Sequence, residues 1–205
     1  MRLSGEAYSK RLESLSDYAI LLLSKCQLMT KDTTYNSLDI IGDPNLNDEQ
    51  VIEKLNELIS TEHEQFVPLS YDVLFQVVCD GIEHGYFSSL YDYLEEKVTL
   101  ELLDEGKTFV GKRYVLEFFL KKRRECFDDE HIMCDVMKVA EGARYGIGEK
   151  CILITYPFEN EKNQYHLLKV YDSNSKIYKL ELYQQLRSLR LVADEEDLNR
   201  NECEK

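Results

Sequence analysis

The sequence predicts an α+β fold: a strongly curved antiparallel sheet with helices against one face, preceded by a helical N-terminal extension. Three observations lead to this prediction. Apolar residues recur in steps of three and four in the first 67 residues, which is a helical period. The period changes to strand-like alternation at residues 98–102. After Ile132, several alternating segments follow one another, separated by short polar turns.

The N-terminal extension, residues 1–67, is predicted to be helical. The stripe of its first helix consists of Leu15, Ala19, Leu22, Cys26 and Met29. This stripe covers little more than two heptads, so packing within the chain is favoured and a dimer contact is the alternative. Residues 30–47 contain an Asp-Pro-Asn turn and are interpreted as a loop. Asn47 and Gln50 have the spacing of a capping box, which predicts a second helix to about residue 62.

The next part of the chain alternates between helix and strand. Ser70 can cap a helix that stops at Gly85, and a shorter helix is expected over residues 88–94. The strand at residues 98–102 leads into a turn at residues 104–106. After Gly111 comes a helix that ends in four cations, Lys121, Lys122, Arg123 and Arg124. These cations complement the helix dipole, and we interpret them as a solvated face.

The remaining sequence predicts a series of antiparallel strands and a tail. Four segments alternate like strands, at residues 132–140, 151–158, 165–171 and 177–183. In the last of them, Tyr178, Leu180 and Leu182 are expected to share a face. Residues 193–205 are mostly charged, which predicts a mobile acidic tail. The expected domains are thus a helical extension at 1–67, an α+β domain at 68–192 and the tail.

Composition and charge exclude several classes of protein. The 205-residue chain has 25 Lys and Arg against 39 Asp and Glu, a formal net charge of −14, and 43% of its residues are hydrophobic. This apolar content excludes a wholly disordered chain, and the negative charge argues against a nucleic-acid partner. The apolar run at residues 18–23 is too short to cross a bilayer, and residues 1–10 lack the features of a signal peptide. We therefore expect a cytoplasmic protein with no membrane partner.

The cysteines and histidines do not form a metal-binding pattern. None of the six cysteines is in a C-x-x-C pair, and the four histidines form no H-x-x-x-H pair. Buried thiols that act as small hydrophobic groups are the expected role of the cysteines. The sequence therefore predicts no metal site and no cofactor.

Two segments resemble the nuclear transport factor 2-like superfamily, in its SnoaL-like branch. Residues 90–120, LYDYLEEKVTLELLDEGKTFVGKRYVLEFFL, have the order helix, acidic turn, strand, F-x-G-K step and helix, with the step at Phe109 to Lys112. Residues 166–183, HLLKVYDSNSKIYKLELY, are similar to the final hairpin of that superfamily. The resemblance covers about residues 68–189. It implies a cone-shaped domain in which the bent sheet wraps around a helix, with a pocket at the wide mouth.

The resemblance also implies where an isomerase of this superfamily would carry its catalytic groups. In the steroid isomerase branch the catalytic aspartate directly follows a glutamate late in the first strand. Glu101 matches that glutamate, but the next residue is Leu102, which cannot accept a proton. Asp135 is the carboxylate available for an oxyanion site on a later strand, and its face is left open by the sequence.

Tyrosine and histidine supply the candidate ligand-binding residues. The chain has 14 tyrosines and no tryptophan, and a tyrosine combines apolar area with a hydroxyl group, which suits a pocket wall. His166 alternates with Leu168 and Val170 and is expected to point inward. A core position is the alternative for each of these residues. The candidates for ligand binding are Tyr93, Tyr156, His166 and Tyr178.

Three functions are consistent with the sequence. We favour a non-catalytic binding module, whose cone pocket or sheet face holds a small apolar or aromatic ligand or a partner protein. The first alternative is an acidic interaction protein, such as an inhibitor, that docks a basic partner. The second is an isomerase- or dehydratase-like enzyme that uses His166 and tyrosines. A homodimer through the open sheet face or the N-terminal helix is a further expectation of the resemblance and the helical stripe.

Overall fold

The chain divides into two units, a helical unit and a sheet unit. The computed structural model describes residues 5–61, 67–126, 131–141, 149–157, 163–184, 186 and 190–193. The helical unit is Met1–Val67 with Phe87–Asp92, and the sheet unit is Pro68–Tyr86 with Tyr93–Lys205. Of the predicted acidic tail, Ala193 ends a strand and residues 194–205 lie outside the described residues.

Four helices form most of the helical unit. They are α1 (Gly5–Glu13), α2 (Asp17–Gln27), α3 (Lys31–Ile41) and α4 (Asp48–Thr61). Helix α2 packs against both α3 and α4. The predicted capping box starts α4, because Gln50 N donates to Asn47 Oδ1 at 2.9 Å and Asn47 N donates to Gln50 Oε1 at 3.0 Å.

Two predictions for the helical unit are corrected by the structure. The predicted stripe of the first helix is interrupted at Leu15, because Ser16 caps a new helix by accepting a hydrogen bond from Ala19 N at 3.3 Å. The predicted loop at 30–47 contains α3, which is capped by Thr30. The buried positions of α3 are Thr33, Ser37 and Ile41, four residues apart. Two of these three are small polar residues, so the hydrophobic period that marks a helix is missing there.

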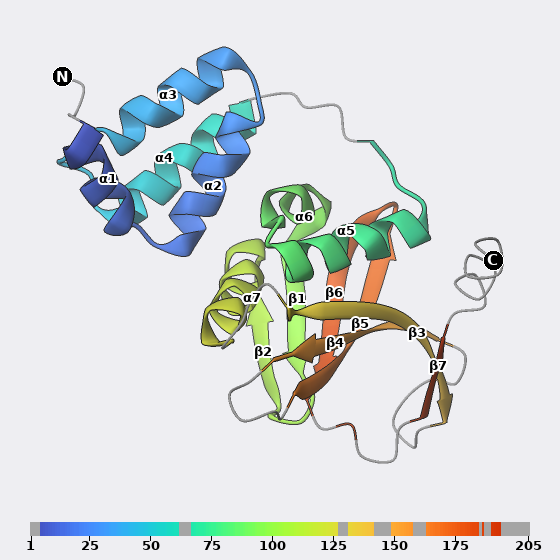
Figure 1. Cartoon of the computed structure of the whole chain (residues 1–205). Coiled ribbons are helices and arrows are strands. Elements are labelled where there is room, and N and C mark those ends of the chain that lie inside the picture. Colours follow the sequence, from blue (N-terminus) through green and yellow to red (C-terminus); the bar gives the residue numbers. More distant parts are fainter. Residues whose placement is uncertain are drawn as a thin grey trace, which may run out of the picture. The chain divides into compact units, whose positions relative to one another are not determined.

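In the described parts of the sheet unit there are seven strands and the helices α5 (Tyr71–His84) and α7 (Lys112–Glu125). Helix α6 (Phe87–Tyr93) is shared, because its first six residues are assigned to the helical unit and Tyr93 is assigned to the sheet unit. The strands are β1 (Leu94–Leu102), β2 (Lys107–Val110), β3 (Met133–Glu141), β4 (Lys150–Tyr156), β5 (Gln164–Ser173), β6 (Lys176–Tyr183) and β7 (Arg190–Ala193). Their order in the sheet is β2-β1-β6-β5-β4-β3-β7. The sheet bends strongly, with α5 lying across one face and α7 beside β1 and β2 (Figure 1). The predicted α+β fold with a curved sheet is therefore confirmed.

One strand pairing differs from the predicted antiparallel sheet. Strand β1 pairs with β6 in parallel, with Leu100 opposite Leu180 and Leu102 opposite Leu182. The other pairings in the sheet are antiparallel. A parallel pair needs a long connection, and here α7 and the strands β3–β5 lie between the two partners in the sequence. Pairing between strands so far apart leaves no local signal in the sequence.

The strand register brings buried apolar side chains of neighbouring strands together on the helix-covered face of the sheet. Leu102 lies opposite Leu182, Leu182 opposite Leu168, and Leu168 opposite Ile152. Cross-strand partners share a face, so these four side chains form one row, and all are buried. Helix α5 covers this face as predicted, since Ser70 caps it and Gly85, at φ 75°, ends it in the left-handed conformation.

The opposite face of the sheet carries charged side chains. Lys179 Nζ lies 3.1 Å from Glu101 Oε2 and 2.8 Å from Glu181 Oε1. Tyr171 donates a hydrogen bond to Glu181 Oε2 at 2.9 Å, and Lys169 pairs with Glu149. The same face also carries a buried apolar cluster, formed by Val139, Cys151, Leu167 and Tyr183.

No helix in the described ranges is long and apolar enough to span a membrane.

Candidate functional site

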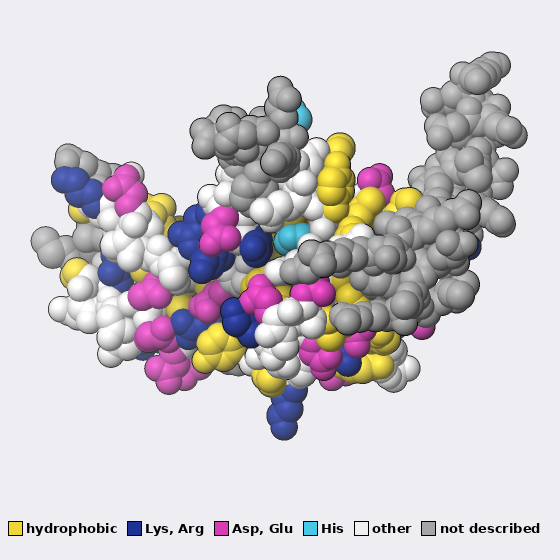
Figure 2. Space-filling view, turned by 90° about the horizontal axis from the view of Figure 1, so that it is seen from below, with side chains coloured by type: hydrophobic (Ala, Val, Ile, Leu, Met, Phe, Trp, Pro, Cys, Tyr) yellow, Lys and Arg dark blue, Asp and Glu magenta, His cyan; other side chains and the backbone are white. Residues whose placement is uncertain are grey.

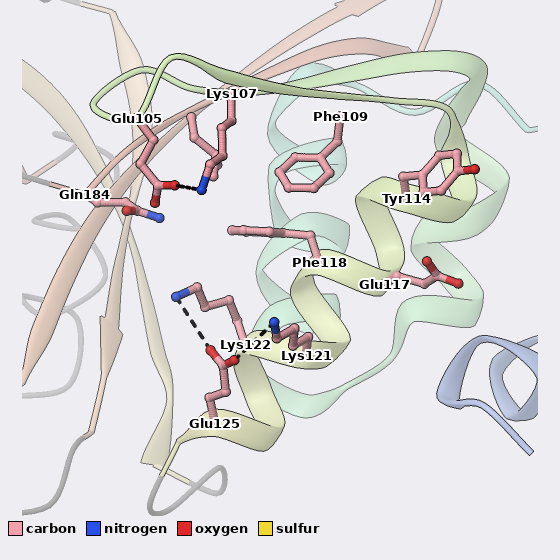
Figure 3. Close-up of a pocket in the computed structure, with 11 residues that line it drawn as sticks. Glu105, Lys107, Phe109, Tyr114, Glu117, Phe118, Lys121, Lys122, Glu125 and Gln184 are labelled. Atoms are coloured by element: carbon pink, nitrogen blue, oxygen red, sulfur yellow. Dashed lines mark hydrogen bonds and ion pairs between the residues drawn. The ribbon is translucent and has the colours of Figure 1, made fainter. Parts of the chain in front are cut away.

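A cavity of about 390 Å³ lies between the β1–β2 hairpin and α7 (Figure 3). Ligand sites in proteins commonly have volumes of about 300–1,000 Å³, so this cavity can hold a small molecule. Its lining consists of Leu102, Glu105, Lys107, Phe109, Tyr114, Glu117, Phe118, Lys121, Lys122, Glu125 and Gln184. All of these residues belong to the sheet unit.

The hairpin is held in place at both of its ends. The turn after β1 contains Gly106 at φ 63°, a conformation that suits glycine, and Asp104 Oδ2 accepts a hydrogen bond from Gln184 N at 2.6 Å. At the other end Gly111 N donates to Val98 O at 2.8 Å. Gly111 has φ 104°, which turns the chain from β2 directly into α7. The hairpin and α7 are thereby fixed as the two walls of the cavity.

One wall of the cavity is aromatic. The rings of Phe109 and Phe118 have centroids 5.4 Å apart and are tilted by 46°. Phe119 supports Phe118 from the core, with centroids 5.3 Å apart in an edge-to-face arrangement. Figure 3 shows Phe109 and Phe118 facing each other, while the hydroxyl group of Tyr114 points away from them. This wall can stack against a flat apolar group.

A complete face of α7 forms the second wall. The residues of this face follow one another in helical steps of three and one: Tyr114, Glu117, Phe118, Lys121, Lys122 and Glu125. Glu117 is paired outside the cavity, since Arg113 Nε donates to its Oε1 at 2.8 Å. Lys121 and Lys122 share Glu125, at 3.6 and 3.7 Å. On the hairpin, a hydrogen bond from Lys107 at 2.6 Å lowers the pKa of Glu105.

Charges of both signs are mixed around the cavity and beyond it. On the face drawn in Figure 2, Lys and Arg side chains lie next to Asp and Glu side chains, with hydrophobic side chains between them. In the described parts of the chain, no group of three or more His, Cys, Asp or Glu side chains is arranged to hold a metal ion.

The structure brings together two of the four predicted ligand-binding residues. The rings of Tyr156 and His166 are edge to face with centroids 5.0 Å apart, and both side chains are buried on the helix-covered face. His166 Nδ1 is buried without a hydrogen-bond partner among the described residues. Burial, assisted by the charge of Lys122, lowers the pKa of His166 to about 4, so its ring is neutral at neutral pH. Burial raises the pKa of Tyr156.

Tyr93 and Tyr178 lie apart from that pair. Tyr93 ends α6 and is half-buried. Tyr178 is the extra residue of a β-bulge, because Tyr171 pairs with Lys179 and Asp172 pairs with Ile177. Tyr178 is 42% exposed, and its ring centroid lies 6.4 Å from that of Tyr171. The prediction that it shares a face with Leu180 and Leu182 is wrong, because the bulge breaks the alternation. None of the four predicted residues lines the cavity.

The strand register settles the face of Asp135. Asp135 lies opposite Leu153, while its neighbour Cys134 lies opposite Ile154, which in turn faces His166. Asp135 is therefore on the sheet face opposite His166 and Tyr156, and it is exposed. The oxyanion site considered from the sequence is not assembled around it.

The cation run 121–124 is divided between two roles. Lys121 and Lys122 line the cavity. Arg123 instead donates two hydrogen bonds of 2.6 Å, to Ile82 O and Glu83 O at the end of α5. The interpretation of the whole run as a solvated face is therefore wrong for Arg123, which caps the neighbouring helix.

No protein-family model matches the sequence, and no curated protein matches it. Several solved structures are similar in part, all at low sequence identity. One is an NTF2-like protein of unknown function from Cytophaga hutchinsonii, with a TM-score of 0.42 and 14% identity over 60% of this chain and 96% of that one. Another is a hypothetical protein with a ketosteroid isomerase-like fold from Catenulispora acidiphila, in complex with trimethylamine, with a TM-score of 0.41 and 12% identity over 57% of this chain and 88% of that one. A de novo designed protein with a curved β-sheet has a TM-score of 0.42 and 20% identity over 57% of this chain and 88% of its own. The first of them carries the name of the superfamily that residues 90–120 and 166–183 resemble.

Proposed function

We propose that the sheet unit, within the domain expected at residues 68–192, is a binding module whose cavity between the hairpin and α7 holds a small ligand with a flat aromatic or apolar group. The observation that carries the proposal is the pair of tilted rings, Phe109 and Phe118, in a cavity of about 390 Å³. Leu102 adds an aliphatic surface to the same cavity. A ligand ring against these side chains would remove apolar area from water and gain aromatic contacts.

The lining of the cavity supports binding rather than chemistry. Leu102 stands where the resemblance to the isomerase branch would place a catalytic aspartate, and it is a lining residue. The carboxylates that do line the cavity, Glu105, Glu117 and Glu125, are each paired with a cation. His166, the candidate acid or base, is buried behind the core face rather than among the lining residues. These features favour a binding module over the enzyme alternative.

The proposal is tested by titrating the full-length protein with 2-naphthamide, an uncharged flat probe, and following probe fluorescence. We expect saturable binding by the wild type and a loss of about tenfold or more in affinity for Phe118→Ala, because one face of the stacking wall disappears. Tyr165→Ala is the matched control, since Tyr165 is an exposed aromatic residue that does not line the cavity.

Two outcomes would overturn this assignment: no binding of 2-naphthamide up to about 1 mM, or equal affinity in the wild type and Phe118→Ala. Circular dichroism and thermal unfolding establish that each variant is folded. Phe118→Leu provides a second test, because it keeps an apolar side chain for packing on Phe119 and removes the flat ring. It should bind the probe more weakly than the wild type.

A further inference from the structure

We propose that the ligand of this cavity carries an anionic group next to its ring, and that Lys122, assisted by Lys121, binds this group. The inference rests on the proposed function and names the chemical class of the ligand: a small aryl carboxylate or a similar aromatic anion. It is carried by donors that line the cavity and have no hydrogen-bonding partner among the residues that the structure describes.

The two lysines have more donors than their shared partner can use. Each ammonium group carries three N–H donors. Glu125 lies 3.6 and 3.7 Å from the two nitrogens, which is beyond ordinary hydrogen-bond length. The other lining carboxylates have closer partners, Glu105 in Lys107 and Glu117 in Arg113, although the charge of Lys122 also acts on Glu105. Among the described residues, the side-chain amide of Gln184 also has no hydrogen-bond partner, and it lines the same cavity.

Lys122 is the better placed of the two cations. Its side chain is 25% exposed, against 71% for Lys121, so its charge is less screened by water. The charge of Lys122 also reaches the buried ring of His166 and helps to lower the pKa of that residue. Lys122 is therefore the more shielded of the two lining cations, and a charge-assisted hydrogen bond from it to an anion is the stronger.

Helix geometry fixes the size of the ligand. Phe118 and Lys122 are four residues apart on α7, so their Cβ atoms are neighbours at roughly 5–6 Å. Figure 3 shows the side chains of Lys121 and Lys122 extending from the last turns of α7 on the side of the Phe118 ring. A ring stacked on Phe118 can thus place a carboxylate at Lys122 only if the acid is attached directly or through a short link.

The overall charge of the chain helps to identify the cause of any preference for an anionic ligand over a neutral one. At a net charge of −14 the protein as a whole repels anions, so long-range attraction cannot produce a preference for an anionic probe. A preference must come from nearby cations. Removal of one cation from the cavity should therefore abolish it, whereas removal of one elsewhere should not.

The test compares 2-naphthoate with 2-naphthamide, which have the same ring and differ in charge, by titration of the full-length protein. We expect the wild type to bind 2-naphthoate about tenfold more tightly, as one charge-assisted hydrogen bond predicts. Lys122→Gln should bind the two probes equally, and Lys122→Arg should keep the preference. Lys97→Gln is the matched control, because Lys97 is an exposed lysine of β1 that does not line the cavity.

The outcomes separate this inference from the proposed function. Equal affinity of the wild type for both probes, with Phe118→Ala still weakening both, would overturn the anion assignment and leave the binding module in place. A preference that survives in Lys122→Gln would also overturn it. If neither probe binds the wild type, the proposed function itself fails.

Discussion

Two regions of the sheet unit contain polar side chains next to apolar ones: the buried pair of His166 and Tyr156, here called the buried strip, and the cavity beside α7. They differ in their contact with water. His166 and Tyr156 are buried under the helix-covered face, and His166 Nδ1 has no partner among the described residues. The cavity is instead lined by lysines that are paired with two carboxylates of the same lining, Glu105 and Glu125. The buried strip can respond to pH, whereas the open cavity can exchange its contacts for those of a ligand.

Two neighbouring cations at the end of α7 differ in the same way. Arg123 points to the end of α5, where it donates to two backbone carbonyl groups, and Lys122 lines the cavity. Arg123 therefore contributes to the stability of the fold, whereas we propose that Lys122 binds a ligand. Three predictions sharpen this division, beginning with the largest effect.

We expect Arg123→Met to lower the free energy of unfolding by about 4 kcal/mol, because two hydrogen bonds from a charged donor are lost and two carbonyl groups lose their partner. Lys122→Met should cost less than about 1 kcal/mol, since its ion pair with Glu125 is long and partly exposed. Urea unfolding of both variants measures the difference. Equal losses would mean that the two sides of α7 do not have separate roles.

The second prediction concerns the pH dependence of stability. The pKa of His166 is lowered to about 4 in the folded chain and is near 6.5 in the unfolded chain. As the pH falls between these values, the unfolded state takes up a proton that the folded state does not, so stability decreases, by up to roughly 3 kcal/mol below about pH 4. His166→Leu should remove this part of the decrease.

Urea unfolding at about pH 7, 5.5 and 4 checks this prediction in the wild type and in His166→Leu. His84→Leu serves as the control, because His84 is exposed in the same unit. If the wild type and His166→Leu lose the same stability between about pH 7 and pH 4, the pKa of His166 is not lowered in the folded chain.

The smallest predicted effect is electrostatic coupling between the two regions. Lys122→Gln should raise the pKa of His166 above its value of about 4, because one of the causes that lower it is removed while burial, the larger cause, stays. Lys97→Gln should leave it unchanged. An NMR titration of the His166 ring protons measures both values. An unchanged pKa in Lys122→Gln would show that the cavity and the strip are electrically independent.

Local signals in the sequence were sufficient to predict several elements in both units. Ser70 and Gly85 mark the two ends of α5, and Asn47 with Gln50 marks the start of α4, because caps act within a few residues. Helix α3 was missed because its buried face carries Thr33 and Ser37. The face of Tyr178 was assigned wrongly because a bulge depends on the partner strand, which the sequence does not identify.

The cavity could not be predicted because its residues are common ones whose arrangement depends on the tertiary fold. Lysines, glutamates and phenylalanines at helical spacing are typical of any amphipathic helix, and only the hairpin opposite α7 turns them into a cavity. Sequence reasoning selected His166 and the tyrosines because these residues often serve in sites. The inward direction expected for His166 agrees with its burial, yet it lies in the core rather than in the lining. The F-x-G-K step did include one lining residue, Phe109, although its ring was not recognised as part of a site.

The most direct test of the central claim is to locate a bound probe by intermolecular NOEs. The protein, with labelled methyl groups, is saturated with 2-naphthoate, and contacts from the naphthalene protons are recorded. We predict NOEs to the methyl groups of Leu102, which line the cavity. Ile154 and Leu168 are the buried neighbours of His166 in the sheet. NOEs to these two residues, without any to Leu102, would place the ligand beside His166 and contradict the proposed binding cavity.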